Sequence, residues 1–219
     1  MMGIQICSNY EWSCVKELLQ ISEELYYPYG AYFYHSIGGR ACLFFRGGVR
    51  KTKSAGACQY MISHQSVRTI YLIGTCGGVN DSLKILDLIM ATQTVQYDCL
   101  PPNSRELILN ALTSDIDLNE IEGIAANHPM LTYGTIGTSD TPLVDIEMKQ
   151  KLMKAGILCS DCESASVAYI CHLNQIPCYI IRGISDFPET EQNQAKDCVK
   201  NTPLIFEKIL CQVLPDLIY

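Results

Sequence analysis

The feature that most constrains the fold is an alternation of short apolar runs with longer segments of helical pattern. Strands are predicted at residues 4–7, 69–73, 85–94, 134–137 and 178–184. Helices are predicted at residues 13–25, 54–63, 104–112, 144–154, 163–173 and 203–214. This alternation is typical of an α/β protein in which helices cover a largely parallel or mixed sheet. No repeat or low-complexity linker interrupts it, so we expect one domain over residues 1–219.

A hairpin is predicted around Gly38-Gly39. Aromatic and apolar residues lead into the two glycines up to Ile37 and resume from Arg40 to Phe45. Paired glycines favour a two-residue turn between antiparallel strands.

Charge and hydropathy exclude several classes of partner. The net charge is −7, so no overall positive field exists to bind nucleic acid or an anionic membrane surface. We find no secretion signal and no apolar run of about 18 residues. We therefore expect a cytoplasmic protein that binds a small molecule, with no nucleic-acid or membrane partner and no cofactor.

Twelve cysteines are unusual for such a chain. They are scattered rather than clustered, unlike a secreted disulfide scaffold. Cys159 and Cys162 form a lone C-x-x-C pair, the spacing of a zinc or redox site, but no second pair accompanies it. We favour buried packing residues and expect no metal.

Polar or glycine residues follow three apolar runs, where ligands bind in open α/β sheets. The first run leads into Thr75, Gly77 and Gly78, where backbone N–H groups can bind a sugar or an anion, or simply form a tight turn. In the second, Arg182 lies inside an apolar strand and requires a partner such as a carboxylate. Asp186 ends that strand, either as a general acid with a raised pKa or as a turn residue.

The third segment places Glu163 at a helix start. A carboxylate there can accept hydrogen bonds from the two hydroxyls of a ribose, or can stabilise the helix dipole. Small residues follow at Ser164, Ala165 and Ser166, which allow the helix to lie close to the sheet.

Taken in order, these segments resemble the nucleoside phosphorylase/nucleosidase superfamily, and most closely its methylthioadenosine/S-adenosylhomocysteine nucleosidase branch. The motifs that carry the resemblance span residues 74–78, 83–87, 137–140, 161–163 and 182–186. The resemblance implies a phosphorylase/hydrolase-like three-layer αβα sandwich with a central mixed sheet. It also implies cleavage of an N-ribosidic bond by a homo-oligomer, with a dimer favoured.

The resemblance also implies residue roles. Asp186 is similar to the general acid that protonates purine N7, Ser185 to its orienting neighbour, and Glu163 to the group that holds the ribose hydroxyls. The remaining substrate-binding residues implied in this way are Asp161, Cys162, Thr75, Cys76, Gly77, Pro142 and Leu143.

The nucleophile distinguishes hydrolases from phosphorylases. Related phosphorylases carry an arginine where this chain has Leu72, so water is the expected nucleophile, held by Arg182 as in the nucleosidases. The family glutamate that activates the water aligns with Cys14, and Glu11 lies one turn earlier; a short loop shift would restore it. The basic segment with Arg46, Arg50, Lys51 and Lys53 offers another phosphate site if Arg50 points inward.

We therefore expect a purine nucleosidase that acts on 5′-methylthioadenosine, S-adenosylhomocysteine or a related adenine nucleoside. The catalytic residues expected are Asp186, Arg182 and Glu11. A nucleoside phosphorylase and a non-catalytic nucleoside-binding protein remain the alternatives.

Overall fold

A mixed β-sheet organises the molecule in the computed structural model, which describes residues 1–99, 114–115, 128, 130–188 and 191–218. The helix predicted at residues 104–112 lies outside the described residues. The strands are β1 (Met2–Ile6), β2 (Leu25–Tyr27), β3 (Gly30–Ile37), β4 (Arg40–Arg46), β5 (Thr69–Gly78), β6 (Leu88–Gln96), β7 (Ser114–Asp115), β8 (Leu131–Thr138), β9 (Ile157–Asp161) and β10 (Cys178–Asp186). The α/β class and the five strand positions predicted from the sequence are confirmed, with shifted ends.

The sheet follows the order β10-β6-β8-β9-β5-β1-β4-β3-β2, and β10 also pairs with β5. The central neighbours β4, β1, β5 and β10 run parallel, as do β6, β8 and β9. The pairs β10–β6 and β5–β9 are antiparallel. Because β10 pairs with both β5 and β6, the sheet closes into a ring of five strands: β10, β6, β8, β9 and β5. The carboxyl ends of β5, β9 and β10 come together in this ring.

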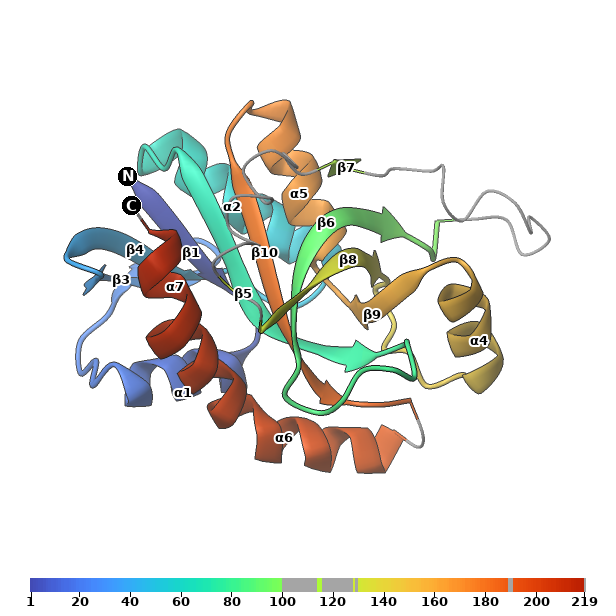
Figure 1. Ribbon diagram of the computed structural model, residues 1–219. Helices are drawn as coiled ribbons and strands as arrows, with labels where there is room; N and C mark the ends of the chain where they lie inside the picture. Colours follow the sequence, from blue (N-terminus) through green and yellow to red (C-terminus); the bar gives the residue numbers. More distant parts are fainter. Residues whose placement is uncertain (100–113, 116–127, 129, 189–190, 219) are drawn as a thin grey trace.

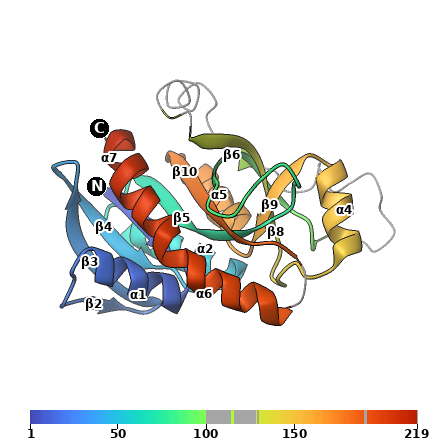
Figure 2. The same cartoon turned by 60° about the horizontal axis from the view of Figure 1, so that its bottom comes forward.

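Two groups of helices cover the sheet (Figure 1). One contains α1 (Asn9–Leu18), α6 (Glu191–Lys208), the π-helical turn η1 (Ile209–Val213) and α7 (Leu214–Leu217); the other contains α2 (Lys51–His64) and α5 (Ser164–Leu173). Figure 2 shows α1, α6 and α7 in front of the sheet and α2 behind it, while α4 (Ile146–Lys154) lies beside β9. The expected three layers are therefore present. Close packing of α6 requires Gly183, because a Cβ there would overlap Ile205.

The Gly38-Gly39 hairpin is confirmed. Strands β3 and β4 pair antiparallel up to Ile37 and Arg40. The two glycines have φ values of +57° and +81°, the left-handed conformation that this turn requires at both positions.

The predicted bounds of the first helix are wrong. The helix starts at Asn9 instead of residue 13, because Ser8 and Glu11 form a capping box that fixes its first turn. It ends at Leu18, and the end of the predicted helix belongs instead to β2.

The last helix begins earlier than predicted. The sequence predicts a start at Pro203, but α6 runs through this residue from Glu191. Proline lacks the N–H that would bond the carbonyl four residues earlier. That carbonyl, of Val199, instead accepts the hydroxyl of Tyr10 at 2.9 Å. In the described part of the chain, no helix is long and apolar enough to cross a membrane.

Candidate active site

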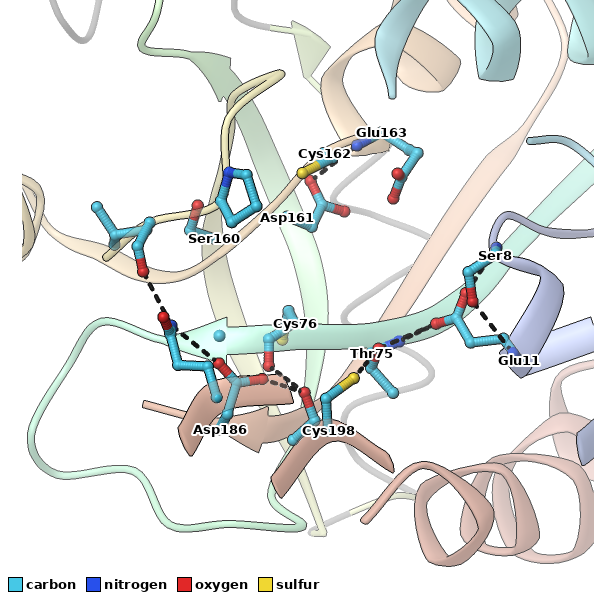
Figure 3. A pocket seen from close by; sticks show the side chains of 15 residues that line it. Ser8, Glu11, Thr75, Cys76, Ser160, Asp161, Cys162, Glu163, Asp186 and Cys198 are labelled. Atoms are coloured by element: carbon cyan, nitrogen blue, oxygen red, sulfur yellow. Dashed lines mark hydrogen bonds between the residues drawn. The ribbon is translucent and has the colours of Figure 1, made fainter. Parts of the chain in front are cut away.

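A cavity lies at the carboxyl ends of β5, β9 and β10, beside the starts of α1 and α5 (Figure 3). Every site residue predicted from the sequence lines it except Arg182. Figure 3 shows Asp186 at one end and Ser8 with Glu11 at the other, with Asp161 to Glu163 across from them. The structure thus brings together residues from widely separated parts of the sequence.

Arg182 is completely buried directly beneath the cavity. Its Nη2 lies 2.7 Å from Asp161 Oδ2 and 3.3 Å from Glu163 Oε2, and its Nε donates to Ser164 Oγ at 3.2 Å. The prediction that this guanidinium needs a carboxylate partner is confirmed. Gly74 stands opposite Arg182 in the sheet, and a Cβ there would overlap the guanidinium.

Asp161 fixes Arg182 and the start of α5 together. Its Oδ1 accepts a hydrogen bond from Thr138 Oγ1 at 2.8 Å, and both its oxygens lie 3.2 Å from the backbone nitrogen of Ser164. With so many donors committed to it, Asp161 acts mainly as the support of Arg182. Thr138 belongs to the motif at residues 137–140, so this motif contributes to the site by holding Asp161.

Glu163 precedes the first residue of α5 and is buried in the cavity wall. Its Oε1 accepts the backbone N–H of Arg50 at 2.9 Å, and its Oε2 faces Arg182. Burial raises the pKa of Glu163 to about 8, because desolvation and the nearby charge of Asp161 outweigh the attraction of Arg182. This carboxyl group therefore holds a proton more readily than an exposed one.

Asp186 ends β10 with both carboxylate oxygens engaged. Ser185 Oγ donates to Oδ1 at 2.5 Å, and Gln194 Nε2 donates to Oδ2 at 3.1 Å. Burial raises the pKa of Asp186, and these two hydrogen bonds act in the opposite direction. Gln194 also donates to the backbone oxygen of Leu143 at 2.9 Å, which ties that wall of the cavity to the acid.

Glu11 lies on the first turn of α1 and is 5% exposed. Its Oε1 accepts the backbone N–H of Thr75 at 2.8 Å and the Thr75 hydroxyl at 3.0 Å. A Cβ built on Gly74 would lie 2.8 Å from this oxygen and would also overlap Arg182 Nη1, which has no hydrogen-bond partner among the described residues. A carboxylate and an unused donor thus converge over a glycine. Cys14, which aligns with the family glutamate, is buried and does not line the cavity.

The basic segment does not enter this cavity. Arg50 contributes its backbone N–H, while its side chain is exposed and not part of the lining. Lys51 is neutralised by Asp98 at 2.6 Å and lies 4.0 Å from Asp140. The condition for a phosphate site built on Arg50 is therefore not met.

Cys76 and Cys162 line the cavity. Burial raises the pKa of the Cys162 thiol to about 12, so it stays protonated near neutral pH. Cys159 lies within β9 and is fully buried. Within the described ranges, no group of three or more His, Cys, Asp and Glu side chains is placed to hold a metal ion.

Four lining residues were not predicted: Ser8, Ser160, Gln194 and Cys198. For Ser8 a signal existed, because a serine three residues before a glutamate is typical of a helix start. Ser160 lies in the strand before a recognised motif. Gln194 and Cys198 lie on α6, in the part of the helix that precedes its predicted start at residue 203.

The fold and the cavity define an α/β protein whose ligand site is built from buried carboxyl groups at the carboxyl edge of a mixed sheet. The chain belongs to the Phosphorylase superfamily, whose family model matches residues 16–214.

Known relatives are nucleosidases. The chain is 30% identical over 167 residues to the aminodeoxyfutalosine nucleosidase of Helicobacter pylori, covering 68% of both chains. It is 23% identical over 176 residues to the 5′-methylthioadenosine/S-adenosylhomocysteine nucleosidase of Glaesserella parasuis, covering 74% of both. The crystal structure of the Helicobacter pylori 5′-methylthioadenosine/S-adenosylhomocysteine nucleosidase superposes with a TM-score of 0.80 at 22% identity, covering 99% of this chain and 97% of that one.

Proposed function

We propose that this protein is a purine nucleosidase that hydrolyses the N-ribosidic bond of a 5′-substituted adenine nucleoside, such as 5′-methylthioadenosine or S-adenosylhomocysteine. The observation that carries the proposal is the placement of Asp186 at one end of the cavity and of Glu11 at the other. The buried Arg182 Nη1 lies next to the Glu11 carboxylate at Gly74. A leaving base and an attacking water need these two kinds of group on opposite sides of the sugar.

At the base end, Asp186 acts as the general acid. Burial raises its pKa and so favours the protonated form, and Ser185 and Gln194 fix the carboxyl group. As the bond between C1′ and N9 breaks, its electron pair moves into the purine, and the proton of Asp186 goes to N7. General acid catalysis of this kind contributes about 10²–10⁴-fold.

At the sugar, Glu163 binds the two ribose hydroxyls. Its two oxygens sit in the wall between the acid and the proposed water site, held by Arg50 N–H and by Arg182. The sugar ring gains positive charge as the base departs. Fixed carboxyl groups around it stabilise that charge more than they stabilise the neutral ground state.

At the other end, water is the nucleophile. The unused Nη1 donor of Arg182 accounts for one hydrogen bond to the water oxygen, and Glu11 takes the proton as the oxygen attacks C1′. Gly74 leaves the room that lets the Arg182 guanidinium and the Glu11 carboxylate approach each other. Phosphate would need a cation to face it, but no described residue lining the cavity is Lys or Arg, and the charge of Arg182 is already paired with Asp161 at 2.7 Å.

An assay of base release tests the proposal. Purified protein is incubated with 5′-methylthioadenosine, adenosine and inosine, each with and without inorganic phosphate. We expect adenine release from the 5′-thio nucleoside that does not depend on phosphate. Release that requires phosphate would identify a phosphorylase instead, and no release from any nucleoside would identify a binding protein.

A further inference from the structure

A second cavity of about 560 Å³ borders the candidate active site. Asn9 lines it, and the preceding residue, Ser8, lines the first cavity. Val49 also lines it, and the next residue, Arg50, donates its backbone N–H to Glu163 in the first cavity. Neighbouring residues at the starts of α1 and α2 therefore contribute to the two sites.

Two cations face this second cavity. Arg46 is half-buried and donates to Asn9 Oδ1 at 3.1 Å, and Lys53 is exposed. No Asp or Glu lines the cavity, and neither cation forms an ion pair with any described carboxylate. A chain with a net charge of −7 thus places two unneutralised cations beside its candidate active site. Such an arrangement attracts an anion.

The rest of this cavity wall is apolar. Pro28, Tyr29 and Val49 line it. Tyr29 packs on α2 at Gly56, where a Cβ would lie 2.6 Å from its ring, so the ring has a fixed position. The stem of Lys53 is likewise held against Gly48, where a Cβ would lie 3.0 Å from Lys53 Cβ. An apolar wall with cations at its edge suits a short apolar chain that ends in an anionic group.

We infer that Arg46 and Lys53 form a basic tail subsite, which binds a carboxylate at the far end of the 5′ substituent of the nucleoside. The inference rests on the proposed function, because that function places the base at Asp186 and the ribose hydroxyls at Glu163. The 5′ carbon is carried by C4′, across the ring oxygen from the C1′ that carries the base. In the proposed placement its substituent therefore extends away from Asp186, toward the end of the cavity where Ser8 lies (Figure 3).

The volume of the first cavity also indicates that a long 5′ substituent extends out of it. The first cavity encloses about 220 Å³. Pockets that hold drug-sized ligands enclose about 300–1,000 Å³. A nucleoside with a substituent longer than methylthio therefore extends beyond the first cavity, and the basic tail subsite borders it.

A pair of ligands that differ only in charge tests this inference. The probes are 5′-(2-carboxyethyl)thioadenosine and its primary amide, which have nearly the same length and shape. Their dissociation constants are measured by calorimetry on Asp186→Asn, and their kcat/KM values on the wild-type protein. We expect the acid to be favoured about two- to fivefold, the effect of a partly exposed ion pair, and less so as salt is raised.

Single substitutions assign the effect to the subsite. Lys53→Gln and Arg46→Gln should each bring the ratio of acid to amide toward one. Lys154→Gln, an exposed lysine at the end of α4, should leave the ratio unchanged. Kinetics with 5′-methylthioadenosine should stay unchanged in Lys154→Gln.

The outcomes separate this inference from the proposed function. Cleavage of 5′-methylthioadenosine together with an acid-to-amide ratio of one would overturn the subsite and leave the nucleosidase. Tighter binding of the acid without cleavage of any nucleoside would support the subsite and refute the nucleosidase. Formation of ribose 1-phosphate when inorganic phosphate is added, lost in Lys53→Gln, would show that these cations bind phosphate and would overturn the inference.

Discussion

Arg182 and Asp161 form an ion pair of 2.7 Å between side chains that are 1% and 2% exposed. Asp161 is held in turn by Thr138 and Ser164, and Gly74 leaves the space that the guanidinium fills. Through this pair, three strands fix the floor of the candidate active site. A buried arginine with one unused donor under a cavity is costly for stability, which indicates that it serves the ligand site.

Asp161→Asn tests how much this ion pair contributes to the stability of the fold. The substitution removes one partner and leaves a buried cation undercompensated, so we expect the free energy of unfolding to fall by about 3–5 kcal/mol. Urea denaturation measures this loss. Glu147→Gln is the control, because it breaks the exposed pair with Lys151 and should cost less than about 0.5 kcal/mol. Equal losses in the two variants would contradict the buried role of Asp161.

Asp186→Asn tests the general acid. An amide keeps the size of the side chain but cannot supply the proton to N7, so kcat should fall by about 10²–10⁴-fold without loss of folding. Steady-state adenine release and circular dichroism check the two parts. Glu207→Gln changes an exposed acid on α6 and should retain wild-type turnover. Near-normal turnover of Asp186→Asn would remove it from the mechanism.

Glu11→Gln tests the water-activating group. Because the amide cannot accept the proton of the water, kcat should again fall by about 10²–10⁴-fold. Glu17→Gln, on the exposed side of the same helix, and Cys14→Ser should both leave kcat within about twofold. A large loss in Cys14→Ser with none in Glu11→Gln would show that the register of α1 differs from this structure.

Glu163 predicts a pH dependence of stability. Its folded pKa, about 8, lies above its ordinary value of 4.5, so the folded state binds the proton more tightly than the unfolded state. The resulting stabilisation is complete below the ordinary pKa and is lost as pH rises through the folded pKa. The free energy of unfolding of Glu163→Gln should therefore decline less than that of the wild type between those two values. Parallel curves from urea titrations at a series of pH values would contradict this assignment.

The carboxylate partner of Arg182 was predictable from the sequence for a physical reason. A guanidinium in an apolar strand must be neutralised, whatever the details of packing. The raised pKa of Asp186 followed similarly from its place at the end of a buried strand. Both predictions depend on burial, which local hydrophobic patterns report well.

Contacts between distant residues were less predictable. The position of Glu11 depends on the capping box with Ser8, which moves the helix start by one turn. The passage of α6 through Pro203 depends on the Tyr10 hydroxyl, which lies far away in sequence and satisfies the freed carbonyl. Gln194 reaches Asp186 only because α6 starts upstream of that proline. In each case a tertiary or capping contact overrides the local signal.

The origin of the oxygen in the sugar product tests the central claim most directly. Wild-type protein is incubated with 5′-methylthioadenosine in ¹⁸O-labelled water with phosphate present. The sugar product is analysed by mass spectrometry at times shorter than the exchange of its C1 oxygen with water, which is measured on unlabelled free sugar in the same buffer. The account predicts free 5′-methylthioribose that carries one ¹⁸O atom from attack at C1′, with adenine released in equal amount. A 1-phosphate ester of the sugar without the label, or no sugar product at all, would contradict it.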